Sequence, residues 1–244
     1  MDLQILGYYG GYPREDGGTS AYLITSGDYH LLMDIGSGAL MALEKIMPPA
    51  QLDAVLLTHY HHDHTADLGV LQYYWQLTQD TKKHDVLPIY GHTKDPLNYA
   101  ALTFEPFTKG FGYTADTTLD LGPLTLTFME TQHPVPAFAV RVTEKATGKT
   151  IVNTSDTRYF SDLARFATGA DLLMADTNFL ADQPAPRWHL TAPEAGTLAN
   201  AANVNQLLLT HLPHANQALL LQQAQASAGD VPVVLAKNNL RLSI

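Results

Sequence analysis

The chain of 244 residues contains no cysteine. This absence excludes disulfide bonds and thiolate ligands, so any metal ion must be bound by histidine, aspartate or glutamate. A chain without cysteine is also compatible with a reducing compartment, and the location we expect is the cytoplasm.

Long hydrophobic runs and clusters of basic residues are also missing. The start, Met1–Gln4, has no basic residue followed by an apolar core, so we expect no signal peptide. The longest uncharged stretch, Gln206–Gly229, contains two histidines, a proline and several glutamines and is too polar to span a bilayer. The net charge of −10 makes a large nucleic acid a poor partner, because phosphate binding needs clustered Lys and Arg.

The residues that are present favour a globular α/β protein. Hydrophobic residues make up 45% of the chain, which is enough for a sizeable core, and no linker or low-complexity tract divides it. We therefore predict one domain over residues 1–244. Strands are predicted at 3–7, 21–25, 30–34, 54–57, 86–91, 124–129, 138–142, 150–156, 171–176, 206–211 and 231–236, and helices at 39–47, 68–75, 161–167 and 192–202.

Two of these predictions rest on specific side-chain patterns. Leu68, Leu71 and Trp75 recur at helical spacing, so one apolar face should pack on the sheet. Thr191 and Glu194 have the spacing of a capping box at the start of a helix. By contrast, the segment Thr93–Asp120 looks irregular, and we regard it as a candidate lid or substrate-facing surface.

The main chemical signal is a cluster of histidines directly after the apolar run Ala54–Leu57. The cluster reads Thr58-His59-Tyr60-His61-His62-Asp63-His64. In an extended chain residues i and i+2 point the same way, so His59 and His61 can bind one ion while Asp63 and His64 face onward as the backbone turns. Imidazole and carboxylate are the donors that Zn²⁺ and related ions prefer. His62 occupies the variable position of this spacing and should face solvent or support the ligands from outside, without binding metal itself.

Other polar residues follow apolar strands later in the chain. Asp156 and Asp176 each end a strand, and His133 lies in a turn before Pro134. The segments Val55–His59 and Leu207–His211 are near-repeats, because both are apolar strands that end in Thr-His. This repeat indicates two related halves that place ligands at one rim.

The pattern His59-x-His61-x-Asp63-His64 resembles the signature of the metallo-β-lactamase-fold hydrolases. The resemblance implies an α/β fold, the four-layer αββα sandwich, with a metal site that activates water. It assigns His59, His61 and His133 to one ion, Asp63, His64 and His211 to a second, and Asp156 to both. Asp34, at the end of a predicted strand, would support this loop from outside the ligand set, although a turn or helix cap explains it equally well.

Within that superfamily the chain is most similar to the RNase Z-like branch. The segment Trp188-His189-Leu190-Thr191 matches a His-x-Thr segment of that branch, whose histidine is thought to protonate the leaving group. His189 and Asp176 would then be catalytic, together with Asp63, which ligates metal and orients the attacking hydroxide. The alternative for His189 is a residue that merely precedes a helix cap.

The chain also departs from the branch. Ala66-Asp67-Leu68-Gly69 replaces the family's Gly-Leu-Pro-Gly, Asp176 is one methylene shorter than the family's Glu, and no long basic arm for tRNA is evident. We therefore expect a hydrolase with two divalent ions, zinc in the first place and Mn²⁺ or Fe²⁺ otherwise, that acts on a small phosphodiester such as a nucleotide.

Three alternatives remain open for the function. They are a thioesterase or lactonase on the same metal site, a tRNA-processing endonuclease, and a metal-binding module without turnover. A β-lactam substrate is disfavoured, because β-lactamases usually lack this dicarboxylate ligand set and act outside the cytoplasm. A homodimer is what the resemblance suggests for the oligomeric state.

Overall fold

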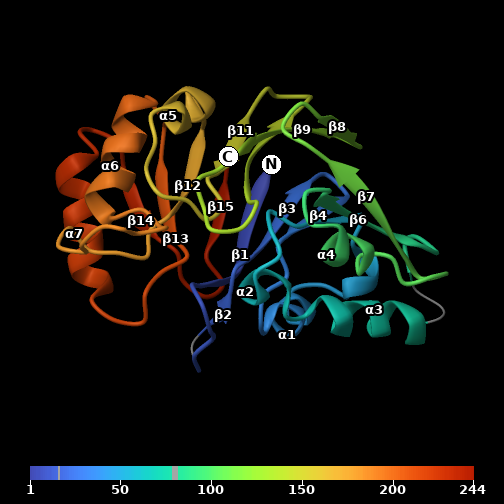
Figure 1. The fold of residues 1–244 in the computed structure, drawn as a ribbon. Coiled ribbons are helices and arrows are strands. Elements are labelled where there is room, and N and C mark those ends of the chain that lie inside the picture. The colour runs from blue at the N-terminus through green and yellow to red at the C-terminus, as the bar shows by residue number, and fades with distance from the viewer. Residues whose placement is uncertain (16, 79–81) are drawn as a thin grey trace. The chain divides into compact units, whose positions relative to one another are not determined.

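The computed structural model describes residues 1–15, 17–78 and 82–244. The contacts within it divide the chain into two compact units. The N-unit contains Met1–Thr114 and Lys237–Ser243, and the C-unit contains Ala115–Ala236 with Ile244. Each unit is built on one sheet (Figure 1). The single domain over residues 1–244 stays a prediction.

The sheet of the N-unit has eight strands in the order β15-β1-β3-β4-β5-β6-β7, with β2 paired to β1. An antiparallel hairpin joins β3 to β4, and β4, β5, β6 and β7 run parallel to one another. The strands are β1 (Asp2–Tyr9), β2 (Gly18–Thr19), β3 (Ala21–Ser26), β4 (Tyr29–Met33), β5 (Ala54–Leu56), β6 (Leu87–His92), β7 (Thr108–Tyr113) and β15 (Arg241–Ser243).

Helices of the N-unit pack on this sheet through apolar side chains. They are α1 (Ala39–Glu44), the 3₁₀ turn η1 (Pro49–Gln51), α2 (His62–Thr65), α3 (Leu68–Leu77) and α4 (Pro96–Ala100). Leu68, Leu71 and Trp75 of α3 are buried in one cluster with Leu43 of α1 and Val55 of β5, which confirms the predicted apolar face. Each such side chain contributes about 1.5–3 kcal/mol by leaving water.

The sheet of the C-unit has seven strands in the order β14-β13-β12-β11-β10-β9-β8. The strands β8 to β11 are antiparallel neighbours, and β11 to β14 run parallel. They are β8 (Thr118–Leu121), β9 (Leu124–Glu130), β10 (Phe138–Glu144), β11 (Thr150–Asn153), β12 (Leu172–Asp176), β13 (Leu207–Thr210) and β14 (Val233–Leu235).

Three helices accompany this sheet: α5 (Asp162–Ala167), α6 (Ala192–Ala201) and α7 (Gln217–Ser227). Helices α6 and α7 pack against each other and contact β12, β13 and β14 (Figure 1). The predicted capping box is confirmed at the start of α6, where the Thr191 hydroxyl accepts from the Glu194 N–H and the Glu194 carboxylate accepts from the Thr191 N–H. This box satisfies backbone donors that the first helical turn leaves unpaired.

The prediction of irregular structure for Thr93–Asp120 was wrong, because this segment contains α4, β7 and the start of β8. Strand β7 has two glycines, which lower strand propensity, but it pairs with β6 along its whole length. The glycines are required by packing: a Cβ on Gly112 would lie 2.5 Å from the Thr93 methyl group, and one on Gly110 would lie 3.0 Å from the Leu102 Cβ. Tertiary contact therefore overrides local propensity here.

No helix within residues 1–15, 17–78 and 82–244 has the length and apolar character needed to cross a membrane.

Candidate metal centre

In the N-unit, Asp34 and Thr58 follow the carboxyl ends of the neighbouring parallel strands β4 and β5. The buried Asp34 carboxylate accepts hydrogen bonds from the Thr58 N–H at 2.7 Å, the Thr58 hydroxyl at 2.9 Å and His64 Nδ1 at 2.8 Å. Since a carboxylate only accepts, Nδ1 of His64 carries the proton and Nε2 presents its lone pair. This arrangement is the one that orients metal-binding histidines in proteins.

The other histidines of the cluster converge in the same place. Nε2 of His59 and Nδ1 of His61 are 3.2 Å apart, and Nε2 of His64 is 3.8 Å from an Asp63 carboxylate oxygen. Two nitrogen ligands of one tetrahedral Zn²⁺ lie about 3.3 Å apart, so the His59–His61 spacing fits a shared ion. His62 is exposed to solvent, as predicted.

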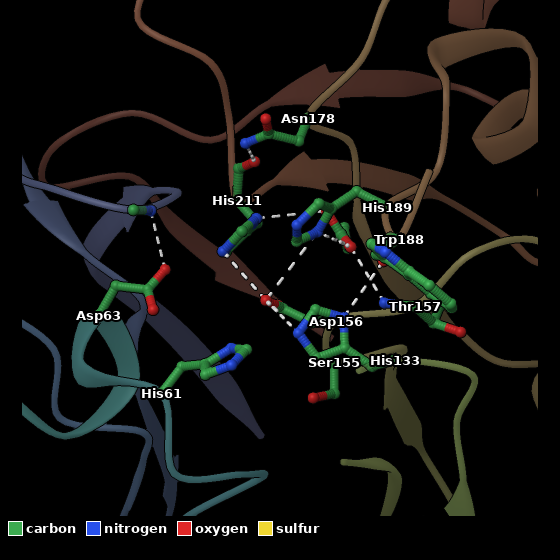
Figure 2. A network of polar contacts seen from close by, with 12 residues as sticks. His61, Asp63, His133, Ser155, Asp156, Thr157, Asn178, Trp188, His189 and His211 are labelled. Carbon is green, nitrogen blue, oxygen red and sulfur yellow. Dashed lines mark hydrogen bonds and ion pairs between the residues drawn. The ribbon is translucent and has the colours of Figure 1, made fainter. Parts of the chain in front are cut away.

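Two glycines, Gly11 and Gly36, lie against Asp63 of the cluster, and the sequence alone predicted no role for either of them. The Gly11 N–H donates to the Asp63 carboxylate at 2.8 Å (Figure 2). A Cβ on Gly36 would lie 2.2 Å from the Asp63 carbonyl oxygen and 2.3 Å from the Thr19 hydroxyl, so only glycine fits beneath the cluster. The glycine-rich loop at residues 10–13 is the one sequence signal that could have suggested such support.

In the C-unit, the parallel strands β11, β12 and β13 bring Asp156, Asp176 and His211 together at their carboxyl ends. One oxygen of the Asp156 carboxylate lies 3.3 Å from His211 Nε2 and 3.8 Å from Nε2 of His133, which comes from the loop between β9 and β10. Figure 2 shows these side chains pointing toward Asp156. A carboxylate oxygen that faces two imidazoles is suited to bind a cation.

The backbone at these strand ends is unusual. Asp34, Ser155 and His211 have φ values of 57°, 53° and 53°, a left-handed conformation that residues other than glycine rarely adopt. The His211 carbonyl also accepts a hydrogen bond from the Asn178 side chain at 2.9 Å. Such strained residues cluster at functional sites, where the surrounding structure maintains them.

His189 and Asp176 form a pair beside these donors. His189 Nδ1 lies 2.8 Å from an Asp176 carboxylate oxygen, which also accepts from the Thr157 N–H at 3.1 Å, and the His189 ring stacks on His211 with centroids 4.9 Å apart (Figure 2). Burial favours a lower pKa for His189, but the charge and hydrogen bond of Asp176 outweigh it and leave the pKa raised. With Nδ1 bound to Asp176, Nε2 of the imidazolium is the available proton donor.

Each unit carries side chains of the types that bind divalent ions. The N-unit brings together His59, His61, Asp63 and His64, and the C-unit brings together His133, Asp156, Asp176, His189 and His211. Within the C-unit, ligand atoms of Asp156, Asp176, His189 and His211 all lie within 4.8 Å of one another. These nitrogen and oxygen donors suit Zn²⁺, Mn²⁺ and Fe²⁺ alike.

Comparison with known proteins agrees with this donor set. A family model described as the β-lactamase superfamily domain matches residues 31–212. The chain is 44% identical to the "Probable metallo-hydrolase YhfI" of Bacillus subtilis over 216 residues, which are 88% of each chain. It is 29% identical to a protein named Ribonuclease Z from Mycobacterium bovis, over 86% of this chain and 85% of that one.

A solved structure gives the same result for the fold. The crystal structure of the metallo-β-lactamase-fold protein YhfI from Bacillus subtilis has a TM-score of 0.93 and 40% identity, and 99% of each chain is covered. The predicted α/β metallo-β-lactamase fold is thereby confirmed, and so is binding of a divalent metal as a property of the family. The chain belongs to the metallo-β-lactamase superfamily of metallo-hydrolases, within the branch that includes RNase Z.

Proposed function

We propose that this chain hydrolyses a small phosphodiester at a centre of two divalent metal ions. The ligands would be His59, His61 and His133 for one ion, Asp63, His64 and His211 for the other, and Asp156 for both. The convergent donors within each unit support this assignment, and the family match at residues 31–212 includes every one of these residues. When bound, the ions supply a water of lowered pKa and polarise the phosphoryl group.

Asp63 would orient the attacking water in this proposal. Its carboxylate is held by the Gly11 N–H at 2.8 Å, so one oxygen has a fixed direction. An oriented carboxylate can accept the hydrogen bond of the water and keep its lone pair directed at phosphorus. This role needs no serine or cysteine nucleophile.

The choice of a phosphodiester as substrate rests on the pair His189–Asp176. The raised pKa of His189 favours an imidazolium whose Nε2 proton can pass to the leaving oxygen of the ester. An alkoxide is a poor leaving group, so this proton is worth about 10²–10⁴-fold in rate. The leaving group of a thioester is a stable thiolate, and its departure gains much less from a general acid. The thioesterase alternative therefore makes little use of this pair.

The class of substrate follows from charge and from the relatives. Relatives from Mycobacterium bovis and Mycobacterium marinum are named Ribonuclease Z, which supports phosphodiester chemistry. The net charge of −10 favours a small ester over a tRNA, since long nucleic acids are bound through many cationic contacts. Hence we propose a nucleotide-sized substrate.

Replacement of His189 by alanine tests this assignment. With a dinucleoside monophosphate, whose leaving group is an alkoxide, and the metal-loaded protein, we expect His189→Ala to lower kcat by about 10²-fold or more while metal content is retained. The loss should be smallest with methyl p-nitrophenyl phosphate, because p-nitrophenolate is a good leaving group and needs the proton least. His62→Ala, which changes an exposed histidine of the same cluster, is the control and should behave like the wild type.

The opposite result would favour a carbonyl-directed hydrolase. In that case the wild-type protein hydrolyses no phosphodiester, and His189→Ala keeps its full rate on thioesters.

A further inference from the structure

An exposed tryptophan lies next to the proposed general acid in the C-unit. The side chain of Trp188 is 42% exposed, although tryptophan is usually buried, and the other tryptophan of the chain, Trp75, is completely buried. Trp188 directly precedes His189 in the chain, and both are labelled in Figure 2. An exposed aromatic ring offers a flat face on which a planar ligand group can stack.

The guanidinium of Arg158 lies over this ring at cation–π distance. It is 5.7 Å from the indole centroid, and Nε of Arg158 donates to the Gln132 side-chain oxygen at 2.7 Å. Within the described part of the chain, Arg158 forms no ion pair with a carboxylate, whereas Arg165 and Arg187 do. Among the described residues, Arg158 is thus a cation without a carboxylate partner, in a protein of net charge −10.

The Trp188–Arg158 pair is tied to the residues of the metal centre. The Trp188 carbonyl oxygen accepts from His133 Nδ1 at 3.2 Å, and the Arg158 N–H donates to the Gln132 carbonyl at 3.1 Å. These backbone contacts fix the pair beside His133 and His189 whatever the two side chains are. A substrate bound on the pair therefore has its ester next to the proposed acid.

A small cavity continues from Arg158. It has a volume of about 170 Å³ and is lined by Arg158, Tyr159, Ala185, Pro186, Arg187 and Glu194. This volume is below the roughly 300–1,000 Å³ of pockets that enclose a whole drug-sized ligand, so it can accept only part of one. Tyr159, which is 36% exposed, adds a second aromatic surface on this side.

We propose that Trp188 and Arg158 form a subsite that holds the planar base of a nucleotide, an inference that rests on the phosphodiesterase function proposed above. Nucleobases are commonly held by stacking on aromatic rings and on arginine guanidinium planes, and such stacking tolerates any base. The unpaired charge of Arg158 adds attraction for the anionic substrate. The subsite would therefore bind nucleotides whatever their base.

A matched pair of esters tests the subsite. Thymidine 5'-(p-nitrophenyl phosphate) and methyl p-nitrophenyl phosphate share the leaving group and differ in the nucleoside. For Trp188→Leu we expect kcat/KM to fall about tenfold on the nucleoside ester, mainly through KM, and to change less than about twofold on the methyl ester. Arg158→Gln should lower the ratio of kcat/KM on the nucleoside ester to kcat/KM on the methyl ester in the same way. Trp188→Phe should keep this ratio close to the wild-type value.

Two control variants isolate the effect. Arg165→Gln removes another exposed arginine of the C-unit, and Tyr73→Leu removes an exposed aromatic ring of the N-unit. Both should leave the ratio of kcat/KM values unchanged. If Trp188→Leu lowers kcat/KM equally on both esters, or changes neither value, the ring does not recognise the nucleoside and the subsite is refuted.

A binding measurement separates this inference from the function on which it rests. Because Trp188 is the exposed one of the two tryptophans, thymidine 5'-monophosphate should quench the fluorescence of the wild-type protein, and methyl phosphate should not. The quenching should disappear in Trp188→Leu. Quenching without hydrolysis of either ester would support the subsite and refute the phosphodiesterase function. Hydrolysis of both esters without quenching would support the phosphodiesterase function and refute the subsite.

Discussion

At the scale of single residues, the carboxylate of Asp34 shows how a residue outside the ligand set can control the ligands. Its three hydrogen bonds join the end of β4 to Thr58 and to His64, and they determine which His64 nitrogen carries the proton. From the sequence alone, Asp34 is equally well interpreted as a turn residue and as a support for the metal-binding loop. The left-handed backbone that places its side chain here is not visible in a residue pattern.

We predict that Asp34→Asn weakens metal binding about 10–100-fold, because an amide can donate to His64 Nδ1 and select the wrong tautomer. A competitive titration with a chromogenic chelator measures the affinity. Asp171→Asn is the control, since Asp171 accepts from the Thr150 N–H at 2.8 Å and from Lys149 at 2.7 Å but lies outside the proposed centre. Equal affinities for Asp34→Asn and the wild type would contradict the role given to Asp34.

A second buried carboxylate, Asp53, lies at the other end of β5 and should matter for stability alone. It accepts from the His30 N–H at 2.8 Å, from Lys83 Nζ at 2.7 Å and from His84 Nε2 at 2.9 Å. Burial favours a higher pKa for Asp53, but these three donors together bring it below the ordinary 3.8. The charged form is therefore the one that the fold stabilises.

For Asp53→Asn we expect the free energy of unfolding at pH 7 to fall by about 2 kcal/mol, because charged hydrogen bonds are lost. Since the folded-state pKa is depressed, the contribution of Asp53 is present above pH 3.8 and is lost as pH falls through the lower folded-state value. Urea unfolding of both proteins between pH 7 and pH 3 should show the difference shrinking with acid. A difference that grows toward low pH would refute this account.

At the scale of elements, strand ends position the chemistry. The sequence predicted which strands end in Asp34, Asp156, Asp176 and His211, because apolar runs that stop at a polar residue are visible in one dimension. Which strands are neighbours was not visible: β11, β12 and β13 are separated in the chain by α5 and α6 and meet only through parallel pairing. The strand character of β7 was missed for the same reason, since its pairing with β6 and its glycine contacts are tertiary.

The loop between β4 and α1 gives a prediction at this scale. Gly36→Ala places a methyl group against the Asp63 carbonyl oxygen and the Thr19 hydroxyl, so the histidine cluster must move. We expect a loss of about 1–3 kcal/mol in the free energy of unfolding together with weaker metal binding. Gly69→Ala is the matched control, because a Cβ there meets no atom within 4 Å and α3 should gain up to about 1 kcal/mol. Unchanged metal affinity in Gly36→Ala would show that this contact does not support the site.

At the scale of the whole molecule, each of the two units carries its own set of histidine and aspartate donors. The near-repeats Thr58-His59 and Thr210-His211 follow strands in comparable positions, since β5 and β13 each have parallel neighbours on both sides in their own sheets. That the two repeats place ligands at one rim stays a prediction. The family was also accessible from sequence, because the spacing of the histidine cluster is specific. The support by Gly11 and Gly36 and the Trp188–Arg158 pair were not, since they depend on backbone contacts between distant segments.

The most direct test of the central claim is elemental analysis of protein purified without added metal, coupled to hydrolysis of methyl p-nitrophenyl phosphate before and after chelation. We predict about two equivalents of divalent metal and a phosphodiesterase rate that chelation abolishes and added Zn²⁺ or Mn²⁺ restores. Two equivalents of metal without phosphodiester turnover would refute the proposed substrate class. Protein without bound metal, or hydrolysis that survives complete chelation, would contradict the dinuclear centre itself.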